Sequence, residues 1–136
     1  MPLFLSKEWV DSYTTELNKS TAYEEAAKTW EGDFVFIGRD DKTKEIVLAA
    51  YFDLWHGKCR KAYKIDDVKN LPKSEFVYDG PISNWKKVLS KELDPIQGLM
   101  SGKFKLTGNM SKVMRAVKAA QELVNTTMKI TTEWPA

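Results

Sequence analysis

The side chains that could bind a metal or act as a nucleophile in this chain are few. His56 and Cys59 are the only histidine and the only cysteine, and their spacing could supply two zinc ligands. A structural zinc site needs four such ligands, and the chain offers no second histidine or cysteine to complete one. The two residues also lie too close together on one turn to act as a separate base and nucleophile. We interpret His56-Gly57 as a hairpin turn and Cys59 as a buried thiol, so the sequence predicts no catalytic residue, no metal and no cofactor.

Paired carboxylates occur twice, at Asp40-Asp41 and at Asp66-Asp67, and both pairs lie in polar segments. Aspartate favours turns because its side chain accepts hydrogen bonds from nearby backbone N–H groups, so we interpret both pairs as turn residues. Asp53 differs because it lies inside an otherwise apolar strand, where a buried carboxylate needs a partner or a raised pKa. Three interpretations of Asp53 stay open: exposure to solvent, an ion pair with Arg or Lys on a neighbouring strand, and a functional role.

Four cations share one predicted strand, over residues 58–65: Lys58, Arg60, Lys61 and Lys64. With Tyr63 beside them they could contact the phosphates of nucleic acid or of lipid head groups. Charge that protects an edge strand from pairing with other chains is the simpler account. The formal net charge of +2 is too small to indicate nucleic-acid binding.

The strongest remaining signal is apolar and lies in the C-terminal third of the chain. Methionine is flexible and polarizable, so it lines surfaces that accept several shapes. Ordinary core packing is the alternative for each residue taken singly. The number and type of these side chains predict an apolar cavity lined by methionine, and they include Leu99, Met100, Phe104, Met110, Met114, Val117, Leu123, Val124 and Met128.

The elements that must position these side chains are clearest over residues 84–114. Asp94-Pro95 begins a short helix, since Asp is a good N-cap and Pro fits the first turn. Residues 103–107 alternate as a half-buried strand, and Asn109 caps a last helix. The helix before Asp94 carries apolar residues at helical spacing: Trp85, Val88, Leu89 and Leu93.

The rest of the chain supplies two N-terminal helices and four strands. The predicted strand at 45–55 is apolar on both faces, which is typical of a central strand with both sides of the sheet covered. The sequence therefore predicts an α+β fold with a single five-stranded mixed sheet, a three-strand antiparallel meander plus two further strands, covered by helices. The predicted helices span 7–17 and 21–30, and the predicted strands span 34–39, 45–55, 58–65, 75–78 and 103–107.

The order of Trp85, Leu-Asp-Pro at 93–95 and the run MSGKFKLTGNM at 100–110 resembles the sterol carrier protein type 2 family. Over residues 21–126 the resemblance rests on the order of elements. It implies a five-stranded sheet with helices packed over it and an apolar tunnel between the two layers. We expect one domain over residues 1–136, with residues 1–20 as an N-terminal helical extension and residues 127–136 as a tail of uncertain structure.

The resemblance implies a non-enzymatic carrier of a fatty acid, fatty acyl-CoA, sterol-like or phospholipid molecule. Burying each methylene contributes about 0.8 kcal/mol, so a sixteen-carbon chain contributes roughly 13 kcal/mol before an association cost of about 4–15 kcal/mol. We expect the C-terminal helix to act as a lid. The predicted wall consists of Phe36, Phe52, Trp85, Leu99, Met100, Phe104, Met114, Val117 and Leu123.

Two other functions stay open. A protein-interaction or dimerisation module would have a filled core and no ligand, and exposed Trp9, Trp30 or Trp134 would favour it. A small enzyme acting on lipid-like substrates would need a nucleophile and a base that the sequence does not supply. With one cysteine, no signal peptide and no apolar run long enough for a membrane span, we expect a cytoplasmic protein. A transient contact with a membrane surface and a homodimer stay open.

Overall fold

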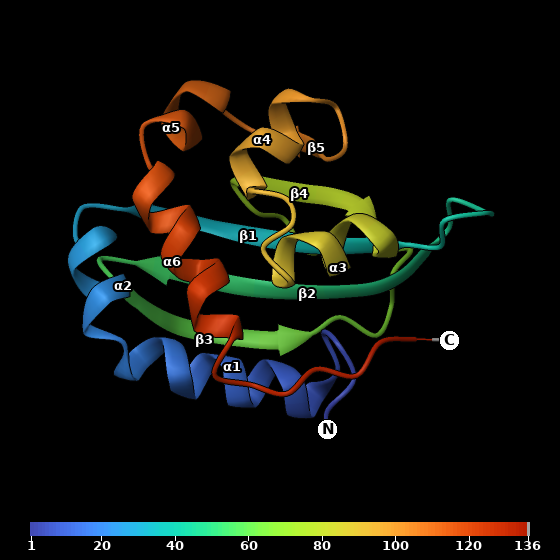
Figure 1. The fold of residues 1–136 in the computed structure, drawn as a ribbon, viewed down its shortest axis with the longest axis horizontal. Coiled ribbons are helices and arrows are strands. Elements are labelled where there is room, and N and C mark those ends of the chain that lie inside the picture. Colours follow the sequence, from blue (N-terminus) through green and yellow to red (C-terminus); the bar gives the residue numbers. More distant parts are fainter. Residues whose placement is uncertain (136) are drawn as a thin grey trace.

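The computed structural model describes residues 1–135, in which helices pack against one mixed five-stranded sheet (Figure 1). The strands lie in the order β3-β2-β1-β4-β5. β1, β2 and β3 form an antiparallel meander, β4 pairs parallel to β1, and β5 pairs antiparallel to β4. The predicted fold class is therefore confirmed. The strands are β1 (Glu31–Arg39), β2 (Ile46–Trp55), β3 (Lys58–Lys64), β4 (Phe76–Pro81) and β5 (Lys105–Thr107).

The six helices of the described residues are α1 (Lys7–Lys19), α2 (Thr21–Ala26), α3 (Ile82–Leu89), α4 (Pro95–Met100), α5 (Met110–Met114) and α6 (Val117–Thr127). The predicted caps are confirmed: Asp94 accepts hydrogen bonds from the first backbone N–H groups of α4, and Asn109 does so at α5. The helix predicted after Asn109 is two helices, because the chain breaks at Arg115-Ala116. None of these helices is long and apolar enough to cross a membrane.

The helices and an irregular segment cover opposite faces of the sheet. In Figure 1, α3, α4 and α6 lie across one face, and α1 runs along β3. The opposite face carries Val35, Ile37 and Ala49, which pack against Val68 and Leu71 from the connection between β3 and β4. The central strands are apolar on both sides, as expected, but only one side needs helices because this connection covers the other.

The outer edge of β3 is protected by α1 rather than by free charge. The Asn18 side chain accepts a hydrogen bond from the Cys59 backbone N–H at 2.8 Å and donates one to the Cys59 carbonyl at 3.0 Å. It thereby takes the place of a neighbouring strand at that point. Cys59 is buried, and the turn before it has positive φ at His56 and Gly57, as a two-residue hairpin requires.

Most of the predicted basic strip on β3 is paired with acidic neighbours. Lys58 contacts Glu24 at 2.9 Å, and Lys64 contacts Asp66 at 3.2 Å. Arg60 donates two hydrogen bonds to Asp53, at 3.1 and 3.2 Å. Of the three interpretations of Asp53, the ion pair with a cation on a neighbouring strand is the one observed.

The two ends of the chain meet beside α1. Leu3 forms a β-bridge with Glu133, and the rings of Phe4 and Trp134 lie 4.7 Å apart. Of the predicted tail at 127–136, Thr127 ends α6 and the segment that follows packs on the N-terminal residues, while Ala136 lies outside the described residues. The predicted N-terminal extension also joins the core, because α1 buries Trp9, Val10, Tyr13 and Leu17.

Candidate functional site: an apolar cavity beneath α6

An apolar cavity of about 90 Å³ lies between the helix-covered face of the sheet and the helices. Strands β1 and β4 form its floor, and α1, α3, α4, α5 and α6 contribute to its sides and roof. The lining comprises Phe4, Leu5, Trp9, Tyr13, Phe34, Phe36, Tyr78, Trp85, Val88, Leu89, Pro95, Ile96, Val113, Ala120, Leu123, Val124 and Thr127.

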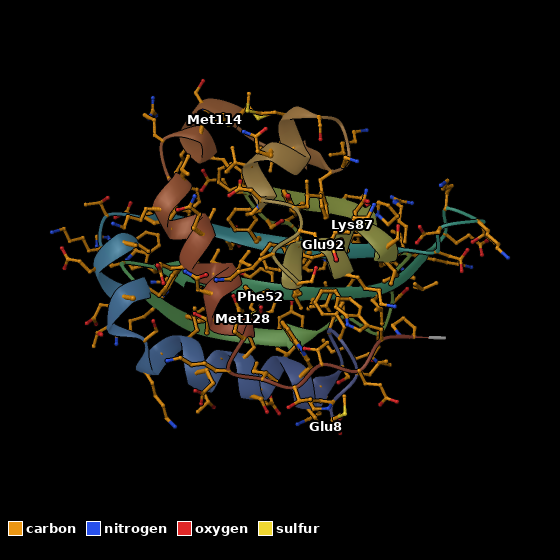
Figure 2. All side chains as sticks on the ribbon, viewed as in Figure 1. Glu8, Phe52, Lys87, Glu92, Met114 and Met128 are labelled. Atoms are coloured by element: carbon orange, nitrogen blue, oxygen red, sulfur yellow. The ribbon has the colours of Figure 1, made fainter. Side chains whose placement is uncertain are left out.

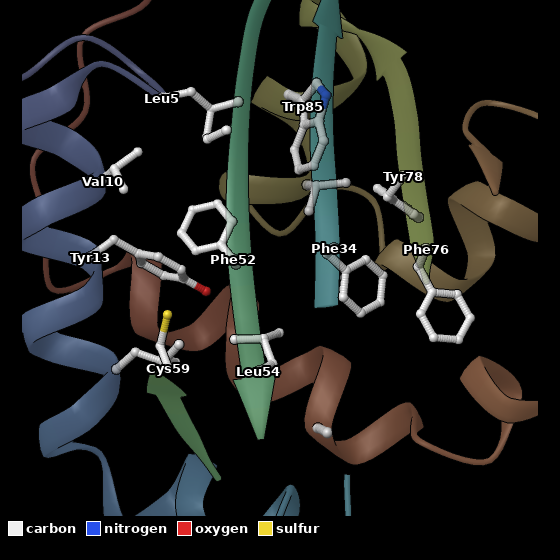
Figure 3. Packing of buried hydrophobic residues seen from close by; sticks show 14 of the residues in the cluster. Leu5, Val10, Tyr13, Phe34, Phe52, Leu54, Cys59, Phe76, Tyr78 and Trp85 are labelled. Atoms are coloured by element: carbon white, nitrogen blue, oxygen red, sulfur yellow. The ribbon is translucent and has the colours of Figure 1, made fainter. Parts of the chain in front are cut away.

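Aromatic rings form a connected wall on the sheet side of the cavity (Figure 3). The Phe36 ring lies 5.4 Å from Phe34, 5.2 Å from Phe52 and 5.6 Å from Trp85. Tyr78 lies 5.5 Å from Trp85 in an edge-to-face arrangement. Such pairs favour fixed geometries, so the rings from β1, β2, β4 and α3 hold one another in place.

The polar tips of the lining aromatic residues are bonded inside the protein and do not face the cavity. Tyr13 Oη donates to the Leu123 carbonyl at 2.7 Å, and Tyr78 Oη donates to the Pro95 carbonyl at 2.6 Å. Trp85 Nε1 donates to the carbonyl of Ile37 at 2.9 Å. A buried water needs two to four polar partners, so a cavity with this surface stays dry and favours hydrocarbon.

Burial keeps the two lining phenols neutral. Desolvation raises the pKa of Tyr13 well above its ordinary value, and it also raises the pKa of Tyr78. A phenolate in this wall would lose its hydration without gaining a cation, which explains the direction of both shifts. The cavity therefore offers no charged side chain to a ligand at any ordinary pH.

Helix α6 forms the roof of the cavity and packs on α1, α2, α3 and α4. Leu123 and Val124 are only partly buried, and the helix begins at Ala116 without a side-chain cap. Its backbone is tied to α1 through the hydrogen bond from Tyr13 to the Leu123 carbonyl. In Figure 1 this helix crosses in front of β1 and β2, as a lid would.

The structure brings three of the nine predicted wall residues to the cavity surface: Phe36, Trp85 and Leu123. Phe52, Leu99 and Phe104 are buried in the same core cluster, behind the lining. Met114 and Val117 are partly buried against that cluster. Met100 lies outside it, 65% exposed, because it ends α4 on the solvent side.

The expectation of a methionine-lined cavity is wrong. Among residues 1–135, no methionine contributes to the lining. Met100, Met110 and Met128 are exposed, and Figure 2 shows Met114 at the α5 end of the molecule, away from Phe52. Aromatic residues from the sheet take the expected place of the methionines.

Sequence reasoning missed several lining residues, and for some of them a signal was available. Phe34 lies two residues before Phe36 on a strand, so the two share a face. Tyr13 lies on the apolar side of the predicted first helix, with Trp9. No pattern in the sequence pointed to Phe4 or to Tyr78 as lining residues.

The residues first considered for metal or nucleophilic chemistry lie apart from the cavity lining. His56 Nε2 contacts Glu31 at 2.6 Å, and burial raises the pKa of the Cys59 thiol to about 11. Within residues 1–135, no group of three or more His, Cys, Asp or Glu side chains is placed to hold a metal ion. The described lining of the cavity is apolar and can bind hydrocarbon by contact.

Comparisons with known proteins agree with the fold. The SCP-2 sterol transfer family matches residues 13–121. A crystal structure of sterol carrier protein 2 is 31% identical, with a TM-score of 0.81 over 94% of this chain and 99% of that one. A conserved hypothetical protein from Thermus thermophilus is also 31% identical, with a TM-score of 0.83 over 96% of this chain and 91% of that one.

A more distant structure shares the fold alone. Sterol carrier protein 2 from Aedes aegypti, in complex with palmitate, is 13% identical, with a TM-score of 0.53 over 85% of this chain and 94% of that one. No curated protein sequence is significantly similar to the chain.

Proposed function

The chain belongs to the SCP-2 sterol transfer family, and from that premise we propose that it is a non-enzymatic lipid carrier. It holds the hydrocarbon part of a fatty acid, fatty acyl-CoA, sterol-like or phospholipid molecule between the sheet and the helices. The observation that carries this proposal is the dry apolar cavity, whose polar tips are bonded within the protein. A protein of the same fold in complex with palmitate supports the same class of ligand.

The size of the cavity requires the roof to move when lipid enters. An engineered apolar cavity of about 150 Å³ in another protein accepts benzene, whereas the cavity here measures about 90 Å³. A hexadecyl chain is several times longer than benzene, so it enters only if α6 moves away from the sheet. Such an opening would extend the cavity toward the apolar tunnel that the family resemblance implies.

The wall residues then divide by role. Phe36, Trp85 and Leu123 contact the hydrocarbon chain of the lipid directly. The side chains of Phe52, Leu99 and Phe104 pack behind these residues and support them. Met114 and Val117 lie near the start of α6 and reach the ligand only when the helix has moved. Met100 has no part in the site, since it is exposed at the end of α4.

One end of the molecule is suited to contact an anionic membrane during delivery. Residues 95–121 carry five of the 21 cations and no acidic residue, which leaves 16 cations against 19 acidic residues elsewhere. Four of these five make no ion pair within residues 1–135: Lys103, Lys105, Arg115 and Lys118. In Figure 1, α4, β5 and α5 lie together at this end, which also exposes Met100 and Met110.

A protein-interaction or dimerisation module is the alternative. An exposed tryptophan would favour it, and the three candidate tryptophans are not exposed. Trp9 is 2% exposed, and Trp30 and Trp134 are packed against the core cluster. None of the three side chains is exposed, although Trp30 and Trp134 are only partly buried. The carrier and the module nevertheless make opposite predictions, so one experiment separates them.

Native mass spectrometry of the delipidated protein, with one representative of each lipid class added in turn, tests the carrier. A carrier gains the mass of one lipid molecule per chain, and the gain requires a hydrocarbon chain or ring system on the added molecule. Failure of every class to bind, with the protein remaining monomeric or shifting to dimer, would contradict the proposal.

A further inference from the structure

Two further hollows adjoin the apolar cavity, and they differ in chemistry. One, of about 30 Å³, shares Phe34, Val113, Ala120 and Leu123 with the cavity and reaches Tyr23, Trp30 and Leu54. The other, of about 240 Å³, shares Val88, Pro95 and Val124 with the cavity. The three hollows therefore lie next to one another, because each neighbouring pair shares wall residues.

The larger hollow is polar, and it opens between the α3–α4 connection and α6. We call it the mouth, and define it by Val88, Lys91, Leu93, Asp94, Pro95, Gln121, Val124 and Asn125. The smaller hollow is lined by aromatic and aliphatic residues. A lipid with one charged end would therefore lie with that end in the mouth, since a charge in the apolar hollow would have no partner.

Asp94, the one acidic residue of the mouth, is already engaged. Its Oδ1 accepts hydrogen bonds from the backbone N–H groups of Ile96 at 2.8 Å and Gln97 at 3.2 Å. Its Oδ2 accepts a long hydrogen bond of 3.5 Å from Gln121 Nε2, which links the start of α4 to α6 across the mouth. The carboxylate therefore serves the N-terminus of α4, and the amide of Gln121 is weakly held.

Lys91 is the one cation of the mouth, and it is exposed. No ion pair within residues 1–135 involves its ammonium group. Its backbone has φ of +67°, a conformation that costs every residue except glycine, at the end of α3 where glycine is usual. The chain places a lysine there instead, with its side chain on the mouth.

We propose that the mouth binds the anionic head group of a single-chain lipid, of which a fatty acid is the simplest. Lys91 supplies the opposing charge, and the amide of Gln121 supplies a donor once it leaves Asp94. The hydrocarbon chain of the lipid then runs through the cavity and ends in the small apolar hollow that Tyr23 and Leu54 line. This inference rests on the proposed carrier function and narrows its ligand to one chain with one small anionic head.

The direction in which the lipid lies can be measured with stearic acid carrying a spin label. A nitroxide at carbon 5 should broaden the backbone amide signals of Lys91 and Asn125 more than those of Tyr23 and Leu54. A nitroxide at carbon 16 should give the opposite pattern. If the two patterns are exchanged, the lipid binds in reverse and the inference is overturned while the carrier function stands. If neither labelled acid nor unlabelled stearate binds while another lipid class does, the inference is overturned and the carrier function stands. If no lipid class binds, both fail.

A charge reversal tests the head-group contact separately. Lys91→Glu should weaken stearate binding by about threefold to fivefold, the upper part of the range expected for one exposed ion pair. Octadecanol has the same chain without the charge, so its affinity should change less than twofold. Lys87→Glu is the matched control, because Lys87 is exposed on α3, close to Glu92 in Figure 2, but does not line the mouth.

The comparison is read as the ratio of stearate to octadecanol affinity in each variant. A lower ratio in Lys91→Glu alone supports the inference. Equal ratios in the two variants, with both proteins folded by circular dichroism, would show that the head group binds elsewhere and would overturn it.

Discussion

Filling the cavity should stabilise the protein and strongly weaken fatty-acid binding at the same time. Ala120 lies on α6 and lines both the cavity and the small apolar hollow beside it. The substitution Ala120→Leu adds three carbon atoms to this surface without adding a polar group. If the space is held open for a ligand, the longer side chain should occupy it.

The magnitude follows from the volume. Empty apolar space lowers the free energy of unfolding by about 24 cal/mol per Å³, so filling a cavity of about 90 Å³ completely would raise that free energy by about 2 kcal/mol. Three buried carbons at about 0.8 kcal/mol each give a similar figure, and imperfect fit removes part of it. We expect Ala120→Leu to raise the free energy of unfolding by about 1 kcal/mol and to weaken fatty-acid binding at least tenfold.

Urea unfolding of the lipid-free protein measures the stability, and displacement of a fluorescent fatty acid measures the binding. Lys118→Leu is the control, since Lys118 lies exposed on the same helix and lines neither hollow. A surface substitution of this kind normally changes stability by less than about 0.5 kcal/mol. The control should leave fatty-acid binding unchanged.

The reasoning would be refuted by unchanged fatty-acid binding in a stable Ala120→Leu protein, because the ligand would then lie elsewhere. Loss of stability by several kcal/mol would refute the volume argument instead, since it would mean that the side chains already fill this space.

Three further predictions concern other parts of the fold. Burial raises the pKa of Cys59 from 9.0 to about 11 in the folded state, so the stability that its neutral thiol contributes is complete below pH 9 and is lost as the pH rises to 11. By pH 11 the free energy of unfolding, measured in urea, should fall by roughly 2 kcal/mol more in the wild type than in Cys59→Ala. Parallel pH curves for the two proteins would contradict this. Asn18→Ala removes the hydrogen bonds to the backbone N–H and carbonyl of Cys59 at the β3 edge, and it should lower the free energy of unfolding by about 2–3 kcal/mol. A loss below about 0.5 kcal/mol would show that water replaces the amide. The double variant Lys103→Glu with Arg115→Glu should weaken binding to vesicles that contain phosphatidylglycerol by at least about fivefold, the factor expected for one charge. Equal sedimentation of wild type and variant with these vesicles would exclude the end formed by α4, β5 and α5 as the membrane-contact surface.

The predicted strands and caps were reliable where a short stretch of backbone decides the outcome. Asp94 and Asn109 cap helices because their side chains reach N–H groups two or three residues away, and His56-Gly57 turns because both residues adopt positive φ. The alternation along residues 34–39 and 45–55 also determines which side chains share a face. These features need no knowledge of distant residues.

The methionines show where local reasoning failed. Residue type predicts that methionine suits an adaptable cavity, but the break at Arg115-Ala116 separates α5 from α6 and places Met110 on the surface. A continuous helix would have presented its apolar side chains along one stripe. The sequence offers no clear reason for that break.

The sequence by itself determined the elements, their caps, their turns and the apolar faces that had to be buried. Only the tertiary structure decided that those faces meet imperfectly, with Tyr13 and Leu123 closing a cavity from opposite ends of the chain. The physical reason is that the volume of a cavity is the small difference between two large volumes, the space that the sheet and helices enclose and the side chains that fill it. Its presence depends on where whole helices come to rest against the sheet, and no local pattern of residues specifies that distance.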